Sequence, residues 1–460
     1  MEYRTEKDSL GDVKVPADAY WGVQAQRAVL NFPVSGLKPH RKLIWATAAV
    51  KHAGAVTNSK MGKLDPALAE YITRAAKEVM DGSLDSQFVV DVYQAGAGTS
   101  HNMNTNEVVA NRALELMGKP RGEYASCSPN DHVNMSQSTN DVFPTAMRIA
   151  GISLFGELIR EVQNLGNSFR GKSEEFDGIL KSARTHLQDA VPIRLGQEFS
   201  GYTLAMEKGA SKLLSAMDEM GELGIGGTAA GTGINTGREY APLMVDNLRD
   251  VTGLDLRLSS NLFYAMQSQN AVLSASGALR YIAVDLVRIA NDLRLLSSGP
   301  LTGLAEITLP PVQPGSSIMP GKVNPVLPEM LDMVCFQVMG NDRTIELAVQ
   351  AGQLELNVMM PVMAQNLLSS AEILKNAVRV FREFCVDGIT ANEGRCRMYV
   401  DKSLALATAL NQHIGYMKAA EVVKEALKSG KTVAQVVAEK GYLTPEEMKT
   451  VLDPMKLTEP

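Results

Sequence analysis

An apolar seam between Val272 and Leu296 constrains the fold of this chain more than any other feature of its sequence. Its apolar positions recur at spacings of three and four, and they are Val272, Ala275, Leu279, Ile282, Leu286, Ile289, Leu293 and Leu296. Because this heptad pattern continues for more than three repeats, it predicts a long helix in a bundle with coiled-coil-like packing.

Three further segments have helical periodicity. Two repeat the three- and four-residue spacing, through Leu154, Leu158, Val162, Leu165 and Phe169 and through Met363, Leu367, Leu374, Val378 and Phe381. A third, at residues 331–347, is apolar around most of its circumference, as a helix buried between neighbours would be. Aromatic residues are only 5% of the chain while Met reaches 23, which favours helices packed by Leu, Ala and Met. The sequence therefore predicts a mainly α-helical protein with a long central bundle.

The length of 460 residues suggests about three structural units at roughly 150 residues each. We expect boundaries near Ser138 and Asn392, where polar and turn-forming residues interrupt the helical pattern. This gives an N-terminal helical domain at 1–138, a central long-helix domain at 139–392 and a small C-terminal helical domain at 393–460. The apolar surface of the central third also indicates that helices pack between subunits of a homo-oligomer.

Charge and hydropathy exclude several classes of function. The 45 Lys+Arg against 51 Asp+Glu give a net charge of −6, and no segment is basic enough to bind nucleic acid. Nothing approaches the roughly 18 consecutive apolar residues of a membrane span, and the opening MEYRTEKDSL is too charged for a secretory signal. We therefore expect a cytoplasmic protein. Its four cysteines form no CxxC pair and are expected to be buried thiols: Cys127, Cys335, Cys385 and Cys396.

Four segments rich in Gly, Ser, Thr and Asn interrupt the helices, at residues 94–106, 126–140, 221–238 and 309–325. They can be plain turns, because these residue types tolerate unusual dihedral angles and cap helices. In an otherwise helical chain they are also where binding groups would gather. The cluster from Gln137 to Asp141, for example, could be only a helix N-cap, and His186 could be a structural histidine.

The segment GSSIMPGKVNP, at residues 315–325, superficially resembles a phosphate-binding loop. Five residues rather than four separate its glycines, Val323 stands where a Ser or Thr would hold Mg²⁺, and no strand is expected before it. Nucleotide binding is therefore disfavoured. The segment offers two hydroxyls, a cation and an amide, flanked by Gly and Pro residues that could let it close and reopen as a lid.

These polar groups point to a class of ligand. Hydroxyls, amides and a lysine, without a Cys/His cluster, suit carboxylate oxygens and an amine better than phosphates or a catalytic zinc. The six histidines show no i,i+4 pair and no HExxH motif. We therefore expect no structural or catalytic transition metal.

The same segments resemble the aspartase/fumarase superfamily. GSSIMPGKVNP is similar to its signature, and the blocks at residues 96–118, 129–146 and 184–199 are similar to its other motifs, in the family's order. The N-terminal EKDSLGDVKVPADAYWGVQAQRA also fits, so the resemblance covers essentially the whole chain. It implies three mostly helical domains, the middle one a long bundle that forms the core of a homotetramer. It also implies active sites built from three subunits.

Within the superfamily the sequence is more similar to the aspartases than to the class II fumarases. The aspartase-like features are Ala97, Thr139, Gln188, LRLLSSGP at 293–300 and NPVLPE at 324–329. Residues 226–229 and 408–416 look fumarase-like, whereas Leu301 and Met360 depart from the usual residues of these groups. The resemblance implies reversible deamination of L-aspartate to fumarate and ammonia. The alternatives are a class II fumarate hydratase acting on L-malate and a catalytically inactive helical scaffold.

Roles for individual residues follow from the resemblance as well. It implies Ser316 as the general base that removes a C3 proton, with Lys322 and His186 also catalytic, and an aci-carboxylate intermediate. The substrate-binding residues that it implies are Thr99, Ser138, Thr139, Asn140, Thr185, His186, Ser317, Lys322 and Asn324. No cofactor is required and no metal ligand is implied, with Mg²⁺ only as an activator. The expected partners are a small dicarboxylate or amino-acid substrate and further copies of the chain, with neither nucleic acid nor a membrane.

Overall fold

The structure is a computed structural model and describes residues 2–459. Most of this part of the chain is helical, and its strands form only two-stranded sheets. The chain divides into two compact units. Unit 1 contains the residues up to Arg160, Ser211–Ala283 and Phe336–Lys375, and unit 2 contains Glu161–Ala210, Val284–Cys335 and the residues from Asn376 onward.

Ten strands and α-helices of residues 2–459 lie entirely in unit 1. They are the strands β1 (Tyr3–Asp8), β2 (Gly11–Pro16), β5 (Glu222–Leu223) and β6 (Arg257–Leu258) and the helices α1 (Val23–Asn31), α2 (Arg41–Lys60), α3 (Pro66–Met80), α4 (Thr99–Leu116), α7 (Tyr240–Thr252) and α8 (Leu262–Gln267). β1 and β2 form an antiparallel pair, and β5 and β6 form a parallel pair. A buried core that includes Ile72, Val79 and Leu114 joins α2, α3 and α4. Small alanines at 46, 48, 49 and 53 of α2 are fully buried, and small side chains allow neighbouring helices to approach closely.

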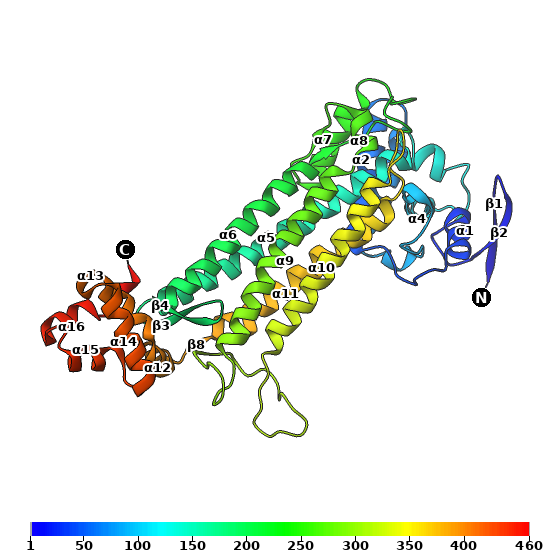
Figure 1. Cartoon of the computed structure of the whole chain (residues 1–460). Helices are drawn as coiled ribbons and strands as arrows, with labels where there is room; N and C mark the ends of the chain where they lie inside the picture. The colour runs from blue at the N-terminus through cyan, green and yellow to red at the C-terminus, as the bar shows by residue number, and fades with distance from the viewer. Residues whose placement is uncertain (1, 460) are drawn as a thin grey trace. The chain divides into compact units, whose positions relative to one another are not determined.

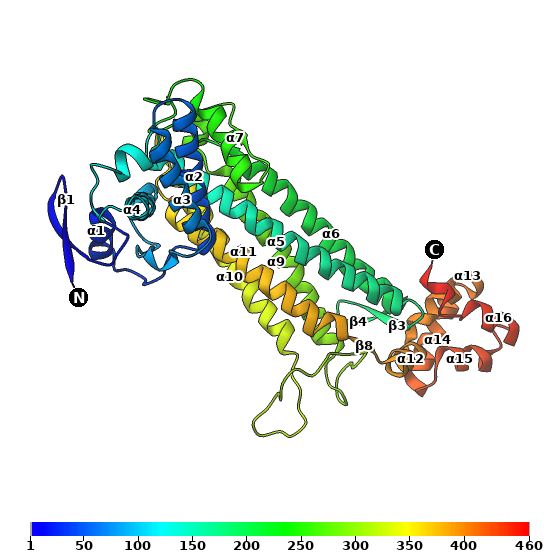
Figure 2. The same cartoon turned by 180° about the vertical axis from the view of Figure 1, so that it is seen from behind.

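Five long helices have residues in both units: α5 (Thr139–Glu175), α6 (Leu195–Met220), α9 (Asn270–Leu296), α10 (Val326–Gln350) and α11 (Met360–Phe384). Within each unit their segments lie side by side (Figure 1, Figure 2). All eight positions of the apolar seam in α9 are at most 5% exposed, and the periodic positions of α5 and α11 are buried too. The three helices predicted from these patterns are confirmed.

The helix predicted at residues 331–347 is confirmed as part of α10, but its complete burial is not found. Met333, Phe336 and Leu347 are 64%, 57% and 46% exposed. Residues 2–459 of a single chain therefore leave large apolar side chains of α10 uncovered, although the sequence pattern is that of a helix packed on most sides.

The remaining strands and α-helices lie in unit 2. They are the hairpin of β3 (Leu180–Thr185) and β4 (Gln188–Arg194), the strands β7 (Ile307–Thr308) and β8 (Thr390–Ala391), and the helices α12 (Glu393–Lys402), α13 (Asn411–Ile414), α14 (Tyr416–Ser429), α15 (Val433–Lys440) and α16 (Pro445–Val451). The C-terminal helices gather around a core that includes Leu410, Val422 and Val437 (Figure 2). α5 begins and α12 begins where the sequence indicated boundaries. The three-domain division itself stays a prediction.

Two further expectations can be compared with the fold. The four cysteines are buried free thiols, as predicted. The expectation that no strand precedes residues 315–325 is wrong, since β7 lies before this segment. However, β7 has only two residues and forms an antiparallel pair with β8, so it is not the parallel strand that precedes a phosphate-binding loop.

α5 is the one helix within residues 2–459 that is long and apolar enough to cross a membrane by length and composition. However, 83% of its most apolar stretch is buried inside the protein. Such burial is typical of a core helix, whose apolar side chains pack against other helices of the same chain.

Candidate active site

Thr99 is the first residue of α4, and the chain reaches it through a tight turn. Ala97 and Gly98 have φ of 60° and 81°, in the left-handed region. A Cβ on Gly98 would lie 2.1 Å from the ring of Phe143, so only glycine fits there. Thr99 is exposed, and the first turn of α4 contains no acidic side chain. The partial positive charge of this helix N-terminus is therefore available to an anion.

Ser138 precedes α5 and caps it, as the N-cap interpretation of this segment predicts. The backbone N–H of Asn140 donates to Ser138 Oγ at 3.2 Å, and the N–H of Ser138 donates to Asp141 Oδ1 at 2.9 Å. Asp141 is fully buried, and its Oδ2 accepts from the N–H groups of Gly226 and Thr228, both at 3.0 Å. Burial raises the pKa of Asp141 to about 6, although these three donors act in the opposite direction.

One hydrogen bond joins the first turns of α4 and α5. Asn102 Nδ2 donates to Thr139 Oγ1 at 3.0 Å, which leaves the hydroxyl hydrogen of Thr139 free for another acceptor. Asn140 Nδ2 donates to the carbonyl of Ala229 at 2.8 Å. Asn102 was not predicted from the sequence, although its place three residues after Thr99, on the same helix face, could have indicated it. Unit 1 thus brings two helix N-termini and their hydroxyls together.

In unit 2, the tip of the β3–β4 hairpin carries Thr185 and His186. Thr185 pairs with Gln188, and the two residues between them, His186 and Leu187, have φ of 56° and 59°. This is the geometry of a type I′ turn, which favours Asn and Gly because it needs the left-handed region twice. His186 and Leu187 therefore adopt a strained conformation at an exposed tip, as functional residues often do.

A buried group of charges anchors the base of this hairpin. Lys181 Nζ lies 2.9 Å from Glu198 and 3.3 Å from Glu306, and Arg184 Nη1 lies 2.9 Å from both carboxylate oxygens of Glu306. The side chain of Glu306 is fully buried. These residues were not singled out from the sequence, because Glu306 is more than a hundred positions away from its partners and no local pattern indicates the pairing.

The segment between β7 and α10 contains the predicted lid. Its ends are pinned together: the N–H of Gly315 donates to the carbonyl of Lys322 at 2.8 Å, and Asn324 Nδ2 donates to the carbonyl of Gly315 at 2.7 Å. A Cβ on Gly315 would lie 2.6 Å from the backbone nitrogen of Asn324, so this closure needs glycine. Asn324 is therefore used inside the loop, where its side chain holds the two ends.

Ser316 lies at the start of this loop and accepts two backbone hydrogen bonds. The N–H groups of Ile318 and Met319 donate to Ser316 Oγ at 3.2 and 3.0 Å. Ser317 and Lys322 are exposed, and Lys322 makes no ion pair with any of residues 2–459. The loop thus presents a hydroxyl with two donors aimed at its oxygen and, further along, an ammonium that makes no ion pair within residues 2–459.

The predicted site residues fall into two sets. Unit 1 holds Thr99, Ser138, Thr139 and Asn140, and unit 2 holds Thr185, His186, Ser316, Ser317, Lys322 and Asn324. Within residues 2–459, no hydrogen bond or ion pair joins the hairpin tip to the loop at 315–325. No three His, Cys, Asp or Glu side chains of this part of the chain gather as metal ligands. Both sets offer hydroxyls to an anion, but only the second carries an ammonium and a histidine.

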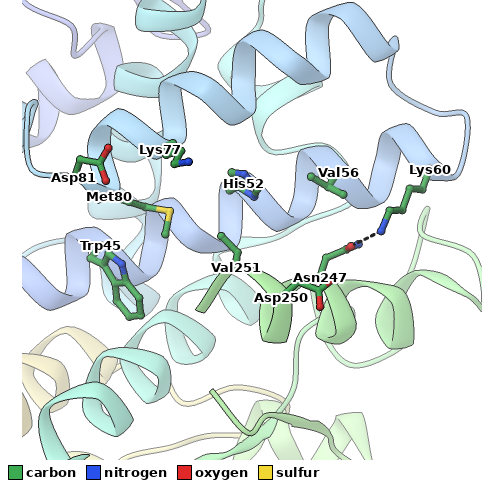
Figure 3. A pocket seen from close by; sticks show the side chains of 10 residues that line it. All are labelled: Trp45, His52, Val56, Lys60, Lys77, Met80, Asp81, Asn247, Asp250 and Val251. Atoms are coloured by element: carbon green, nitrogen blue, oxygen red, sulfur yellow. Dashed lines mark hydrogen bonds between the residues drawn. The ribbon is translucent and has the colours of Figure 1, made fainter. Parts of the chain in front are cut away.

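A cavity of about 480 Å³ lies elsewhere in unit 1, between α2, α3 and α7 (Figure 3). None of the predicted site residues lines it. Lys60 bridges one end by donating to Asn247 at 2.7 Å, and Trp45 lies towards the other end (Figure 3). Nδ1 of His52 is buried without a partner, and burial and the charge of Lys77 lower the pKa of His52. The cavity is therefore separate from the expected chemistry.

Comparisons with known proteins identify the family. The model of the family described as Lyase matches residues 11–340, and that of the Fumarase C C-terminus matches residues 406–459. The chain is 48% identical over 459 residues to aspartate ammonia-lyase of Bacillus subtilis, covering 100% of this chain and 97% of that protein. It is 50% identical over 458 residues to class II fumarate hydratase of Halobacterium salinarum, covering 99% and 97%.

Solved structures agree. The crystal structure of fumarate lyase:delta crystallin from Brucella melitensis bound to cobalt matches with a TM-score of 0.97 at 48% identity, covering 100% of both chains. The crystal structure of recombinant class II fumarase from Schistosoma mansoni matches with a TM-score of 0.96 at 38% identity, covering 99% of both. The aspartase/fumarase fold expected from the sequence is therefore confirmed, and this chain belongs to the lyase family whose members include aspartate ammonia-lyases and class II fumarate hydratases.

Proposed function

We propose that this protein is an aspartate ammonia-lyase that converts L-aspartate reversibly to fumarate and ammonia. The observation that carries the proposal is the environment of Ser316 Oγ, which accepts N–H groups from Ile318 and Met319 at 3.2 and 3.0 Å. A serine can act as a base only where its oxyanion is stabilised, and two aimed backbone donors supply such stabilisation.

The reaction needs a base because the C3 proton of aspartate is weakly acidic. Its loss leaves a carbanion whose charge moves onto the neighbouring carboxylate and forms an aci-carboxylate dianion. Preorganised donors placed around this developing charge contribute most to the rate. The proposal assigns Ser316 to the proton and the other hydroxyl and amide donors to the two carboxylates.

Unit 1 supplies the fixed part of the carboxylate site. The N-termini of α4 and α5 both carry partial positive charge, and the Asn102–Thr139 hydrogen bond joins them. Thr99, Ser138 and Thr139 present hydroxyls there, while Asn140 is held by the carbonyl of Ala229. A carboxylate that binds at these termini would replace water as the acceptor of donors already in position.

Unit 2 supplies the remaining groups. Lys322 is exposed and makes no ion pair within residues 2–459, so its ammonium is free to bind the second carboxylate. Thr185 and His186 lie at a strained tip that the buried charges at the base of the hairpin hold in place. His186 orients the substrate or assists the leaving amine, and Ser317 adds a hydroxyl when the loop closes.

The proposal includes a homotetramer with active sites shared between three subunits. Support comes from large apolar side chains that the single chain leaves exposed on its long helices, among them Phe336 of α10, Val284 of α9 and Leu204 of α6, which are 57%, 54% and 51% exposed. Apolar faces of this kind mark interfaces between subunits. Light scattering after gel filtration is expected to give four times the 49.6 kDa chain mass.

Paired assays test the reaction. The protein is incubated with L-aspartate and, separately, with L-malate, and fumarate is followed by its ultraviolet absorbance. Fumarate from aspartate alone supports the proposal, and fumarate from malate alone selects the fumarate hydratase alternative. Fumarate from neither substrate supports the inactive scaffold.

The proposal also includes a cytoplasmic location, consistent with four free thiols, and no required cofactor. Because no residue of the proposed mechanism depends on a metal, Mg²⁺ would act only as an activator. Exhaustive treatment with EDTA is therefore expected to leave basal turnover intact. Complete loss that Mg²⁺ restores would contradict this part of the proposal.

A further inference from the structure

Lys51 lies in the middle of α2 and is fully buried, with 0% of its surface exposed. Its ammonium donates to Asn134 Oδ1 at 2.9 Å and to Gln137 Oε1 at 3.0 Å. Both partners are neutral amide oxygens, and Lys51 makes no ion pair within residues 2–459. A lysine without a carboxylate partner is unusual at such depth, because a buried ammonium without a counter-charge is costly.

The nearest candidate for a counter-charge is already engaged. Asp141 acts electrostatically on Lys51 but does not form an ion pair with it. Its two carboxylate oxygens accept the backbone N–H groups of Ser138, Gly226 and Thr228. Asp141 therefore acts on Lys51 only from a distance, and no carboxylate of residues 2–459 contacts the ammonium.

The two acceptors of Lys51 both lie in the segment that leads into α5. Asn134 Oδ1 also receives Asn102 Nδ2 at 3.4 Å, and this same nitrogen donates to Thr139 Oγ1 at 3.0 Å. Gln137 directly precedes the capping residue Ser138. Lys51 is thus connected through one or two hydrogen bonds to the N-termini of both α4 and α5.

We infer that Lys51 is a positioning residue for the carboxylate site of unit 1, where it fixes the segment before α5 and places a buried positive charge behind the two helix N-termini. The bound dicarboxylate then adds negative charge to that which Asp141 already provides near Lys51. The inference rests on the proposed function for the identity of the anion. Lys51 touches no substrate and acts through Asn134 and Gln137.

The protonation of Lys51 provides one readout. Burial lowers the pKa of Lys51 to about 7, with the charge of Asp141 opposing the shift. The titratable groups that act on this site are Asp141 and His101, and burial together with the charge of Lys51 lowers the pKa of His101 to about 3. His101 is therefore neutral above pH 6.5 and Asp141 mostly ionised, so Lys51 is the group of this cluster that changes charge as pH rises through about 7.

Calorimetric binding of succinate, a dicarboxylate that cannot react, tests the inference without requiring turnover. Lys51→Met removes the charge and keeps an unbranched side chain, and it is expected to weaken succinate about tenfold, because one charge is lost near the anion. The melting temperature is measured as well, because loss of the ammonium leaves the side-chain oxygens of Asn134 and Gln137 without this donor. The matched control is Lys42→Met on the same helix, where Glu157 at 2.8 Å already compensates the ammonium, and it should leave succinate affinity unchanged.

Other outcomes decide against the inference. A succinate affinity within about twofold of the wild type in a folded Lys51→Met protein overturns it, as does a wild type that does not bind succinate. If Lys51→Met does not fold, the wild type decides. Its succinate affinity should fall about tenfold between pH 6.5 and 8.5 as Lys51 loses its proton, and an unchanged affinity overturns the inference.

The proposed function can fail separately. A wild type that turns over neither aspartate nor malate, yet binds succinate with an affinity that depends on Lys51, contradicts the proposed reaction and supports this inference. Turnover of aspartate with a succinate affinity independent of Lys51 supports the reaction and overturns the role of Lys51.

Discussion

At the start of α5, the backbone N–H of Asn140 donates to the Ser138 hydroxyl, and the N–H of Ser138 donates to the buried carboxylate of Asp141. At residues 315–325, by contrast, the hydrogen bonds that Ser316 and Lys322 make all lie within the loop itself. The first region is fixed by a buried polar network. In the second, residues 316–322 make no hydrogen bond or ion pair with any described residue outside the loop, so we expect this segment to move more readily.

The difference fits two requirements of the proposed reaction. A carboxylate site works best when its donors do not have to reorganise, and buried networks provide this rigidity. The base must admit substrate and then exclude water, which requires a segment that opens and closes. The fold therefore separates binding groups that are fixed from a base that can move.

Loss of the Ser316 hydroxyl should give the largest effect. Ser316→Ala is expected to lower kcat by about a thousandfold, the contribution typical of a general base, while KM changes by less than about threefold. Steady-state kinetics with L-aspartate measure both. The matched control is Ser317→Ala, one residue along the same exposed loop, which should lose much less activity. Near-normal turnover by Ser316→Ala would reject the assignment of the base.

Gly98→Ala tests the rigid region, because Gly98 precedes α4 and lies against Phe143 of α5. The added Cβ would lie 2.1 Å from Phe143 at a φ of 81°, so the variant should lose about 3 kcal/mol of unfolding free energy through overlap and backbone strain. Urea denaturation measures the loss. Gly118→Ala, beyond the other end of α4, has a φ of 74° but open space around its Cβ, and it should lose only about 1 kcal/mol. Equal losses in the two variants would show that contact with Phe143 is unimportant.

The contrast between the two regions also separates what the sequence could and could not predict. Helices α5, α9 and α11 were predictable because heptad spacing directly reports a buried helix face. The cap at Ser138 was predictable because capping depends on neighbours within three residues. For α10 the pattern gave the helix but not its exposure, because apolar residues on most sides do not reveal whether they pack within one chain or between chains.

The buried side chains that support the start of α5 and the β3–β4 hairpin could not be predicted. The partners of Lys51 are 83 and 86 positions away, and Glu306 is 122 positions from Arg184. Such pairs have no period in the sequence. The strained turn at His186 was also unpredictable, since His-Leu is not a residue pair that favours a type I′ geometry. The candidate residues themselves came from the family resemblance, and the structure added how several of them are held.

Limited proteolysis can show whether the loop at 315–325 closes. Lys322 is exposed, so trypsin should cleave after it in the free protein, and succinate at about ten times its Kd should slow this cleavage about tenfold if binding selects a closed loop. Cleavage after Lys449, which is exposed far along the chain in α16, provides the internal control and should keep its rate. Equal protection at both lysines would indicate global stabilisation, and no protection would indicate a loop that stays open.

The turn at the hairpin tip should give the smallest effect and separates strain from function. Leu187 has a φ of 59° and is 72% exposed, so Leu187→Gly removes backbone strain without removing a buried contact. The free energy of unfolding should rise by about 0.5 kcal/mol, seen as a slightly higher melting temperature, and turnover should stay normal.

His186→Asn relieves the neighbouring residue, at a φ of 56°, to a similar extent, because Asn tolerates this region better than other non-glycine residues. If His186 contacts the substrate, this second variant should lose about tenfold in kcat/KM, an effect of the size expected for one hydrogen bond, despite its gain in stability. These two results together would show that the backbone strain at His186 serves catalysis, whereas the strain at Leu187 does not. Unchanged KM and kcat in His186→Asn would remove His186 from the active site and leave the turn as a structural feature alone.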